Sequence, residues 1–540
     1  MSSGGIHGIE IVFLLLLLFV VAFGALAQKL KTPYPIVLVV GGLLLSFLPR
    51  IPRVMLQPDL IFFVVLPPLL FSAAWLTSWR EFSYNLVSIL FLAFGLVAFT
   101  VIAVTQASQW LIPGFDWRMG LVLGAVVAPT DAIAATSIAQ RIGLPKRIVD
   151  ILEGESLVND ASALLALEFG LALLVGGENP TFTTGLFRLA YLIAVGIVLG
   201  LLIGEIVHQI EDRIDHAPIE IALSILTPYV TYLAADSIRA SGVLAVVACG
   251  LYLSRKSSHY FSPGVRLQAF AVWDSLTFIL NGLVFILIGL QLPYVLGAIH
   301  AYSVSTLVLY GATFSAFLIL LRLVWMYPGA YLANLVRRYV LHQNERMPGM
   351  RQIFVVGWTG MRGVISLAAA IALPQTLADG TPFMQRNMII FLAFSVILVT
   401  LVLQGLTLPP LIRAVGLAAI STPDTEEREA RRVILNAALT HLEQSRTKDV
   451  PEMAEVYDDL AHHYRQRLAV VNQERTGTHE NNIPDLYNRF KDLSHELFRV
   501  ERRTAVQLRN QRRISDALLR ELERELDLDE ARLLAKRSDR

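Results

Sequence analysis

The stretch Gly154-Glu155-Ser156-Leu157-Val158-Asn159-Asp160 is the most informative part of this sequence. It lies inside an apolar segment from about Ile148 to Val175, which is long enough to cross a bilayer at ~1.5 Å per residue. A charged side chain at the bilayer centre costs roughly 2.5 to 3.5 kcal/mol, so it requires a partner, a water-filled cavity or an ion. We therefore interpret Asp160 as an ion-binding carboxylate.

The composition is that of a membrane protein with many spans. Hydrophobic residues make up 55% of the 540 residues and charged residues 16%, which is far from the soluble globular average. The formal net charge of +1 gives no reason to expect nucleic-acid binding. The single cysteine, Cys249, allows no disulfide within the chain.

Charged residues become dense only in the last part of the chain, which predicts a domain boundary. We expect a transmembrane domain over residues 1–420 and a cytoplasmic, helical, regulatory domain over residues 421–540. In the second domain, apolar residues at alternating steps of four and three are typical of a helix-packing seam. These residues are Leu486, Phe490, Leu493, Leu497 and Val500.

Apolar runs separated by proline, glycine or charged residues predict about thirteen membrane-spanning helices. The first run is read as a retained helix and not as a signal peptide, because no positive charge precedes it. The runs cover residues 9–27, 35–48, 60–77, 86–108, 119–140, 148–175, 187–209, 219–237, 241–254, 270–292, 302–327, 353–373 and 389–413.

Positive charges in the loops predict the orientation of these spans. With the N-terminus outside, about fourteen Lys and Arg residues fall in the inner loops and about six outside, so the C-terminal domain is predicted to be cytoplasmic. The inner set is Lys29, Lys31, Arg80, Arg141, Lys146, Arg147, Arg213, Arg255, Lys256, Arg266, Arg337, Arg338, Arg346 and Arg351.

Two of the predicted spans carry helix-breaking sequences. The fifth contains Ala128-Pro129-Thr130-Asp131, and the twelfth contains the glycine-rich run from Gly357 to Gly363. Broken helices at matching places in two halves are typical of inverted-repeat transporters. We therefore predict an all-α membrane fold with two inverted six-helix repeats and two broken helices.

The oxygen-bearing side chains near the first break form the candidate ion site. Thr130, Asp131, Ser156 and Asp160 offer hard oxygen ligands suited to an alkali cation, and a broken helix adds free carbonyl groups. A cation and a proton would compete for the Asp160 carboxylate. That competition alone predicts one-for-one exchange without nucleotide, and no phosphate-binding loop of the Walker type is present in the sequence.

The chain resembles the cation/proton antiporter-1 family of bacterial NhaP-type proteins and animal sodium/proton exchangers. The resemblance covers residues 9 to 415 and rests on four stretches in the same order and spacing as in that family. They are Leu66-Pro67-Pro68-Leu69-Leu70-Phe71, Pro129-Thr130-Asp131, Gly154 to Asp160, and Gly360-Met361-Arg362-Gly363-Val364-Ile365.

The resemblance implies a homodimer in the bacterial inner membrane with two crossed broken helices in an elevator-like moving core. It assigns Thr130, Asp131, Ser156 and Asp160 to Na⁺ or K⁺ and proton binding, with no cofactor. Asn159 matches the neutral neighbour of electroneutral relatives. The family also implies a structural ion pair between Glu155 and Arg362.

Other polar residues in the spans receive plainer interpretations. Ser72 stands where several NhaP-type relatives carry a carboxylate, which puts a role of the third span in doubt. Arg322 is expected to snorkel toward the membrane surface, and Glu168 and Glu205 to be paired or placed at helix ends. Asn281 is read as a cap or a structural hydrogen-bonding residue.

Several alternatives remain open from the sequence. Na⁺/H⁺ exchange is the first reading and K⁺/H⁺ exchange the second. An intramembrane aspartyl protease also carries two membrane aspartates, but the motifs of such enzymes surround neither Asp131 nor Asp160. A cation channel would carry current, and an ion sensor would bind without transport.

Overall fold

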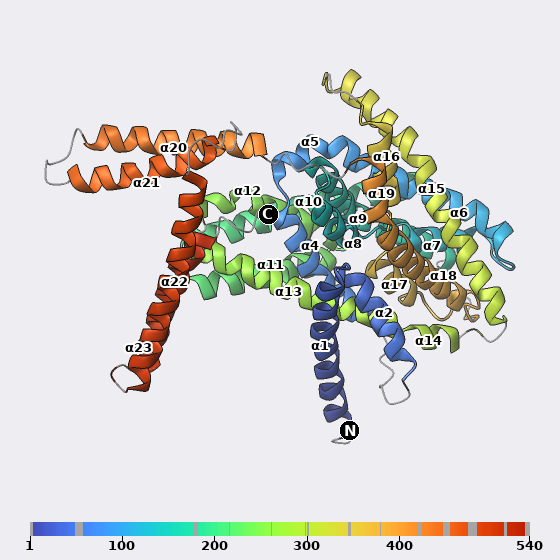
Figure 1. Ribbon diagram of the computed structural model, residues 1–540. Coiled ribbons are helices and arrows are strands. Elements are labelled where there is room, and N and C mark those ends of the chain that lie inside the picture. The colour runs from blue at the N-terminus through green and yellow to red at the C-terminus, as the bar shows by residue number, and fades with distance from the viewer. Residues whose placement is uncertain are drawn as a thin grey trace. The chain divides into compact units, whose positions relative to one another are not determined.

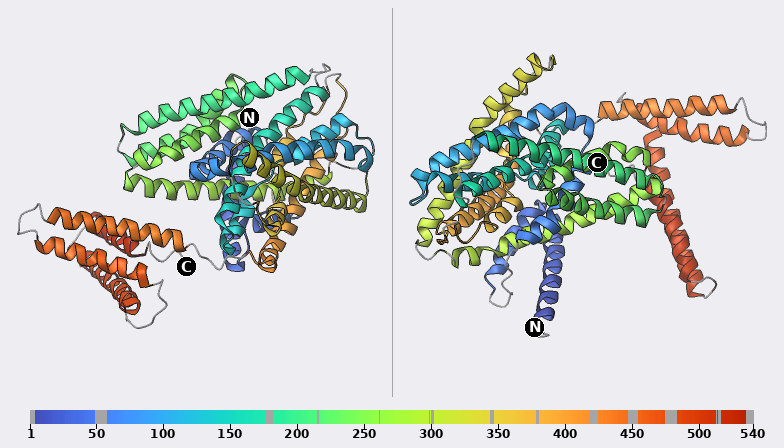
Figure 2. Two further views of the ribbon diagram at one scale, coloured as in Figure 1. Left: turned by 90° about the horizontal axis from the view of Figure 1, so that it is seen from above. Right: turned by 180° about the vertical axis from the view of Figure 1, so that it is seen from behind.

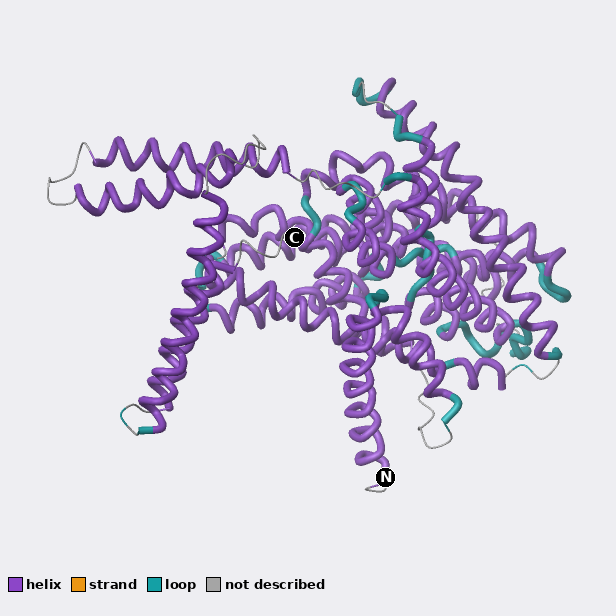
Figure 3. Tube along the Cα trace, viewed as in Figure 1, coloured by secondary structure: helices purple, strands orange, loops and turns teal. Residues whose placement is uncertain are grey.

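A computed structural model describes residues 4–48, 58–175, 182–214, 216–260, 262–297, 299, 302–343, 347–377, 380–417, 424–446, 454–473, 483–511, 513 and 516–534. Within these residues the chain is helical and holds no β-strand (Figure 3). The chain divides into two compact units, Met1–Ile420 and Ser421–Arg540.

The helices of the first unit are labelled in Figure 1. They are α1 (Gly4–Leu30), α2 (Tyr34–Ser46), α3 (Pro58–Leu60), α4 (Leu66–Leu76), α5 (Trp79–Leu90), α6 (Val97–Leu111), α7 (Trp117–Val127), α8 (Ala132–Ile142), α9 (Lys146–Val175), α10 (Phe182–Glu211), α11 (Ala217–Ser237), α12 (Gly242–Tyr260), α13 (Pro263–Leu290), α14 (Leu292–Gly297), α15 (Val304–Tyr339), α16 (Met350–Trp358), α17 (Val364–Ile371), α18 (Arg386–Val399) and α19 (Gly405–Val415). Three π-helices, η1 (Ile61–Val65), η2 (Phe91–Leu96) and η3 (Thr400–Gln404), continue directly into α4, α6 and α19.

Each predicted span overlaps a helix, or a helix with an interruption, of this unit. Within the described residues, ten helices are long and apolar enough to cross a membrane, and α2 is a shorter apolar helix. The predicted total of thirteen crossings therefore stays a prediction. Predicted ends also differ from observed ones: the eleventh span was predicted to end at residue 327, but α15 continues to Tyr339.

Two helical segments are interrupted at the helix-breaking sequences. α7 ends at Val127 and α8 begins at Ala132, so residues 128–131 are not helical. α16 ends at Trp358 and α17 begins at Val364, so residues 359–363 are not helical either. Both interruptions leave backbone groups free to bind partners outside their own helix.

Glycines allow close helix packing in this unit. α2 packs along α13, where a Cβ on Gly42 would lie 2.3 Å from the Ile286 carbonyl oxygen. A Cβ on Gly289 would lie 2.3 Å from the Val39 oxygen. Small residues that permit such backbone approach are typical of helix interfaces in membranes.

A second group consists of α10, α11 and α12, which pack against one another, with α12 also contacting α4. These helices lie side by side in both views of Figure 2. α9 packs against α5, α7 and α8. The contacts of α9 therefore place Gly154 to Asp160 beside the first break.

The second unit consists of α20 (Asp424–Arg446), α21 (Ala454–Gln473), α22 (Ile483–Asn510) and α23 (Asp516–Leu534). α20 packs along α21, with Arg446 and Asp458 in contact at 2.8 Å, and α22 packs along α23. Arg502 on α22 contacts Asp527 and Glu530 on α23, both at 2.5 Å.

The predicted seam on α22 is not used for packing within the described part of this unit. Leu493, Leu497 and Val500 are exposed by 51%, 55% and 57%. The side chains of Leu486 and Phe490 lie outside the described ones. The three described seam residues are therefore not packed within this unit, and a role of the seam in packing on a second copy of the chain stays a prediction.

Candidate functional site

The two helix interruptions contact each other directly. The Asp131 backbone N–H donates a hydrogen bond of 2.9 Å to the Met361 carbonyl oxygen. A Cβ on Gly363 would lie 2.4 Å from Asp131 Oδ2, so only glycine fits there without displacing the carboxylate. The free backbone groups of one interruption thus satisfy those of the other.

α9 holds the first interruption through three of its side chains. Ser156 Oγ donates to the Thr130 carbonyl oxygen at 3.1 Å and accepts from the Ala132 N–H at 3.3 Å. Asn159 Nδ2 donates to Thr130 Oγ1 at 2.6 Å. Thr130 Oγ1 in turn donates to Glu155 Oε1 at 2.9 Å. Thr130 is therefore fixed by both its backbone and its hydroxyl.

Glu155 forms its ion pair with Arg322 of α15 and not with Arg362. The Arg322 guanidinium donates to Glu155 Oε1 at 2.6 Å and to Oε2 at 2.9 Å, and Arg322 is only 2% exposed. Two expectations are thus corrected: the pairing of Glu155 with Arg362, and the snorkelling of Arg322. The reason is that α15 directs this side chain inward, beside Gly360, where a Cβ would lie 2.2 Å from Arg322 Cδ.

Arg362 is also buried, but it has a different role. Its guanidinium donates to the Gly360 carbonyl oxygen at 3.2 Å, inside the second interruption. Its backbone N–H donates to Thr400 Oγ1 at 3.0 Å. Thr400 begins the π-helix η3, and π-helices inside longer helices are frequent at functional sites. η3 therefore supports the second interruption.

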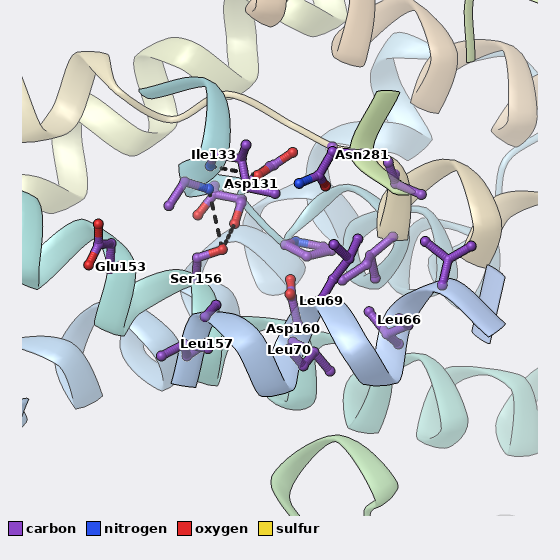
Figure 4. A pocket seen from close by; sticks show the side chains of 18 of the residues that line it. Leu66, Leu69, Leu70, Asp131, Ile133, Glu153, Ser156, Leu157, Asp160 and Asn281 are labelled. Atoms are coloured by element: carbon purple, nitrogen blue, oxygen red, sulfur yellow. Dashed lines mark hydrogen bonds between the residues drawn. The ribbon is translucent and has the colours of Figure 1, made fainter. Parts of the chain in front are cut away.

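A cavity of about 220 Å³ opens beside the two interruptions. Thr130, Asp131, Ser156 and Asp160 all line it, and Figure 4 shows Asp131, Ser156 and Asp160 around it. Asp131 Oδ1 accepts from the Ile133 N–H at 2.8 Å. Asp160 is 6% exposed, and no described residue forms a hydrogen bond or ion pair with its carboxylate.

The third span supplies an apolar wall of this cavity. Leu66, Leu69 and Leu70 of α4 line it, whereas Ser72 does not. The Ser72 hydroxyl donates to the Leu69 carbonyl oxygen at 3.0 Å within its own helix. No oxygen ligand comes from α4 among the described residues.

Glu168 and Glu205, the two glutamates expected to be paired or at helix ends, lie outside the cavity lining. Glu168 pairs with Arg188 at 3.2 Å. Glu205 accepts from Gln209 at 2.8 Å and contacts the Tyr252 hydroxyl. Both residues are paired, as expected.

Three residues near the cavity were not singled out as site residues in the sequence. Asn281 of α13 and Glu153 of α9 line the cavity, and Tyr34 of α2 lies beside Asn281 and near Asp131. Spacing could have found Glu153, because a residue seven positions before Asp160 shares its helix face. Nothing in the sequence brings α2 and α13 to this site.

The transmembrane family of sodium/hydrogen exchangers matches residues 14–414. An uncharacterised Na⁺/H⁺ exchanger of Mycobacterium tuberculosis is 34% identical over 546 residues, covering 99% of this chain and 97% of the relative. A Bacillus pumilus protein named a sodium, potassium, lithium and rubidium/H⁺ antiporter is 33% identical over 455 residues, covering 82% of this chain and 66% of the relative.

The fold is similar to a solved structure, the sodium proton antiporter MjNhaP1 from Methanocaldococcus jannaschii. The TM-score is 0.56 at 20% identity, covering 76% of this chain and 98% of that protein. The likeness fits a multi-pass membrane fold. The chain belongs to the sodium/hydrogen exchanger family and is a membrane-spanning antiporter of monovalent cations and protons.

Proposed function

We propose that the protein exchanges Na⁺ for H⁺ one for one, with both ions binding in turn at Asp160. The observation that carries this proposal is the Asp160 carboxylate, which is buried, lines a cavity and has no hydrogen-bonding partner among the described residues. A bare charge in such a place is unfavourable, so a cation or a proton must neutralise it.

The surrounding groups support a small cation site. Asp131, Ser156 and the carbonyl of Thr130 place oxygen atoms near the same cavity, and oxygen ligands suit alkali cations. Asn159 uses its amide to hold Thr130 and adds no charge. Glu155 is neutralised by Arg322. The exchange of one cation for one proton at this site is therefore electroneutral.

K⁺/H⁺ exchange is the second candidate. The printed name of the Bacillus pumilus relative includes potassium, lithium and rubidium beside sodium. A cavity of about 220 Å³ with an apolar wall imposes no tight size limit on the ion.

Transport requires that the site face each side of the membrane in turn. We propose that α7–α8, α9 and α16–α17 move as one elevator-like core, because the first interruption is hydrogen-bonded both to the second interruption and to α9. We further propose a homodimer in the bacterial inner membrane, with inverted repeats, an external N-terminus and a cytoplasmic C-terminal unit.

We expect purified protein in liposomes to dissipate an imposed proton gradient when Na⁺ is added, and to generate no current while doing so. The gradient can be followed with a pH-sensitive dye and the current with a voltage-sensitive dye, using Na⁺, K⁺ and Li⁺ in turn. A cation-dependent current would contradict electroneutral exchange. Proton movement with K⁺ but not Na⁺ would favour the second candidate.

The C-terminal unit, residues 421–540, is proposed to regulate exchange. The sequence from Thr422 to Arg540 holds no recognisable ligand or catalytic cluster. We expect a chain ending at about Thr422 to retain cation-dependent proton movement, with a changed rate or pH profile. An unchanged pH profile with a lower melting temperature would mean that the unit stabilises the protein and does not regulate exchange. Loss of cation binding in the folded, shortened protein would contradict both roles.

A further inference from the structure

We propose that Glu153 forms a second cation-binding site on the path to Asp160, at the end of the cavity nearer the start of α9. This inference rests on the proposed function, because it gives Glu153 a role in delivering the same cation. Glu153 is half-buried and lines the same cavity as Asp131, Ser156 and Asp160.

Helix geometry places Glu153 in line with the transport site. Residues 153, 156 and 160 share one face of α9, because steps of three and four return to the same side of a helix. Figure 4 shows Glu153, Ser156 and Asp160 following one another along this helix. A spacing of seven residues corresponds to about 10.5 Å along the axis. A cation bound at Glu153 is therefore too far from Asp160 to be coordinated by both carboxylates at once. It is close enough to move from Glu153 to Asp160 through the cavity.

The charges around Glu153 favour a cation. On its own helix, Asp150 and Lys146 act on Glu153 most directly, whereas Arg147 lies over the Tyr84 ring, 5.4 Å from its centroid. From α5, Glu81 faces the same region and contacts Lys146 at 3.5 Å. Glu81, Asp150 and Glu153 thus place three carboxylates around Lys146 in this region. No described residue forms a hydrogen bond or ion pair with the Glu153 carboxylate.

The expected effect of Glu153→Gln is a higher KM for the cation at one membrane side with an unchanged kcat. Removing a unit charge about 10 Å from a cation that approaches along this path changes the local cation concentration roughly 4- to 16-fold at an effective dielectric constant of about 20 to 40. The increase is expected on the side faced by the start of α9, because only cations that enter from that side pass Glu153 before they reach Asp160. Lys146 and the C-terminal unit are both predicted to be on the cytoplasmic side. Protease access to the C-terminal unit therefore shows which vesicle side is the cytoplasmic one.

Two matched variants control this experiment. Glu153→Asp keeps the charge and should keep KM near that of the unchanged protein. Glu168→Gln removes a carboxylate from the same helix outside the cavity lining and should change KM at neither side. Added choline should reduce the difference between Glu153→Gln and the unchanged protein, because salt screens charge at this distance.

The proposal would be overturned if Glu153→Gln had the same KM as the unchanged protein at each side of the membrane. Complete loss of exchange in folded Glu153→Gln would also overturn it, because Glu153 would then belong to the transport site itself. Either result differs from failure of the proposed function, in which the unchanged protein shows no exchange or Asp160→Asn remains active.

Discussion

Asp160→Asn is expected to reduce cation-dependent proton movement to the level of empty liposomes. The substitution keeps the size of the side chain but removes the charge that a cation or proton must neutralise. No described residue bonds to the Asp160 carboxylate, so its loss breaks no structural contact. Proteoliposome flux measured across a range of Na⁺ concentrations and pH values tests this expectation.

A binding measurement separates loss of transport from loss of the site. Na⁺ should raise the melting temperature of the unchanged protein, since a ligand stabilises the state that binds it. Na⁺ should not raise the melting temperature of Asp160→Asn. Without Na⁺, we expect the variant and the unchanged protein to have nearly the same melting temperature. Asp131→Asn is expected to raise the KM for the cation or to stop transport. Full exchange by Asp160→Asn would refute the central proposal.

Removing either partner of the Glu155–Arg322 pair is expected to destabilise the membrane unit by about 3 to 5 kcal/mol. Each of Glu155→Gln and Arg322→Gln leaves an opposite charge buried without its counterion, since the two residues are 1% and 2% exposed. Thermal unfolding in detergent measures the change. The double variant should lose less stability than the sum of the single variants.

The Arg188–Glu168 pair provides the matched control. Its contact of 3.2 Å is also an arginine–glutamate pair, but the side chains are 43% and 54% exposed. Exposed pairs contribute about 0 to 1 kcal/mol, so Arg188→Gln should barely change the melting temperature. If Arg322→Gln and Arg188→Gln have the same melting temperature, the Glu155–Arg322 pair does not contribute the proposed stability.

The sequence predicted the interrupted helices because proline and clustered glycines have local effects on the backbone. It also singled out Thr130, Asp131, Ser156 and Asp160, since polar groups in apolar segments require an explanation wherever they are. Their roles as ion ligands remain a prediction. All four line one cavity.

The pairing of charges could not be predicted in the same way. The sequence offers two arginines, Arg322 and Arg362, and no distance from either to Glu155. Which one reaches Glu155 depends on the rotation of α15 about its axis. The π-helices were missed for a similar reason: the extra residue in η3, which brings Thr400 to the Arg362 N–H, follows from packing and not from a residue type.

The bond between the Asp131 N–H and the Met361 carbonyl joins two main-chain groups. No side-chain replacement removes it, except proline at position 131. This contact between the two interruptions can therefore persist while nearby side chains diverge. A protein built in this way can acquire a different ion preference by single mutations without losing the backbone frame of its site. Directed evolution for Li⁺ or K⁺ selectivity should accordingly find its changes at cavity-lining positions such as Asn281 and Leu69.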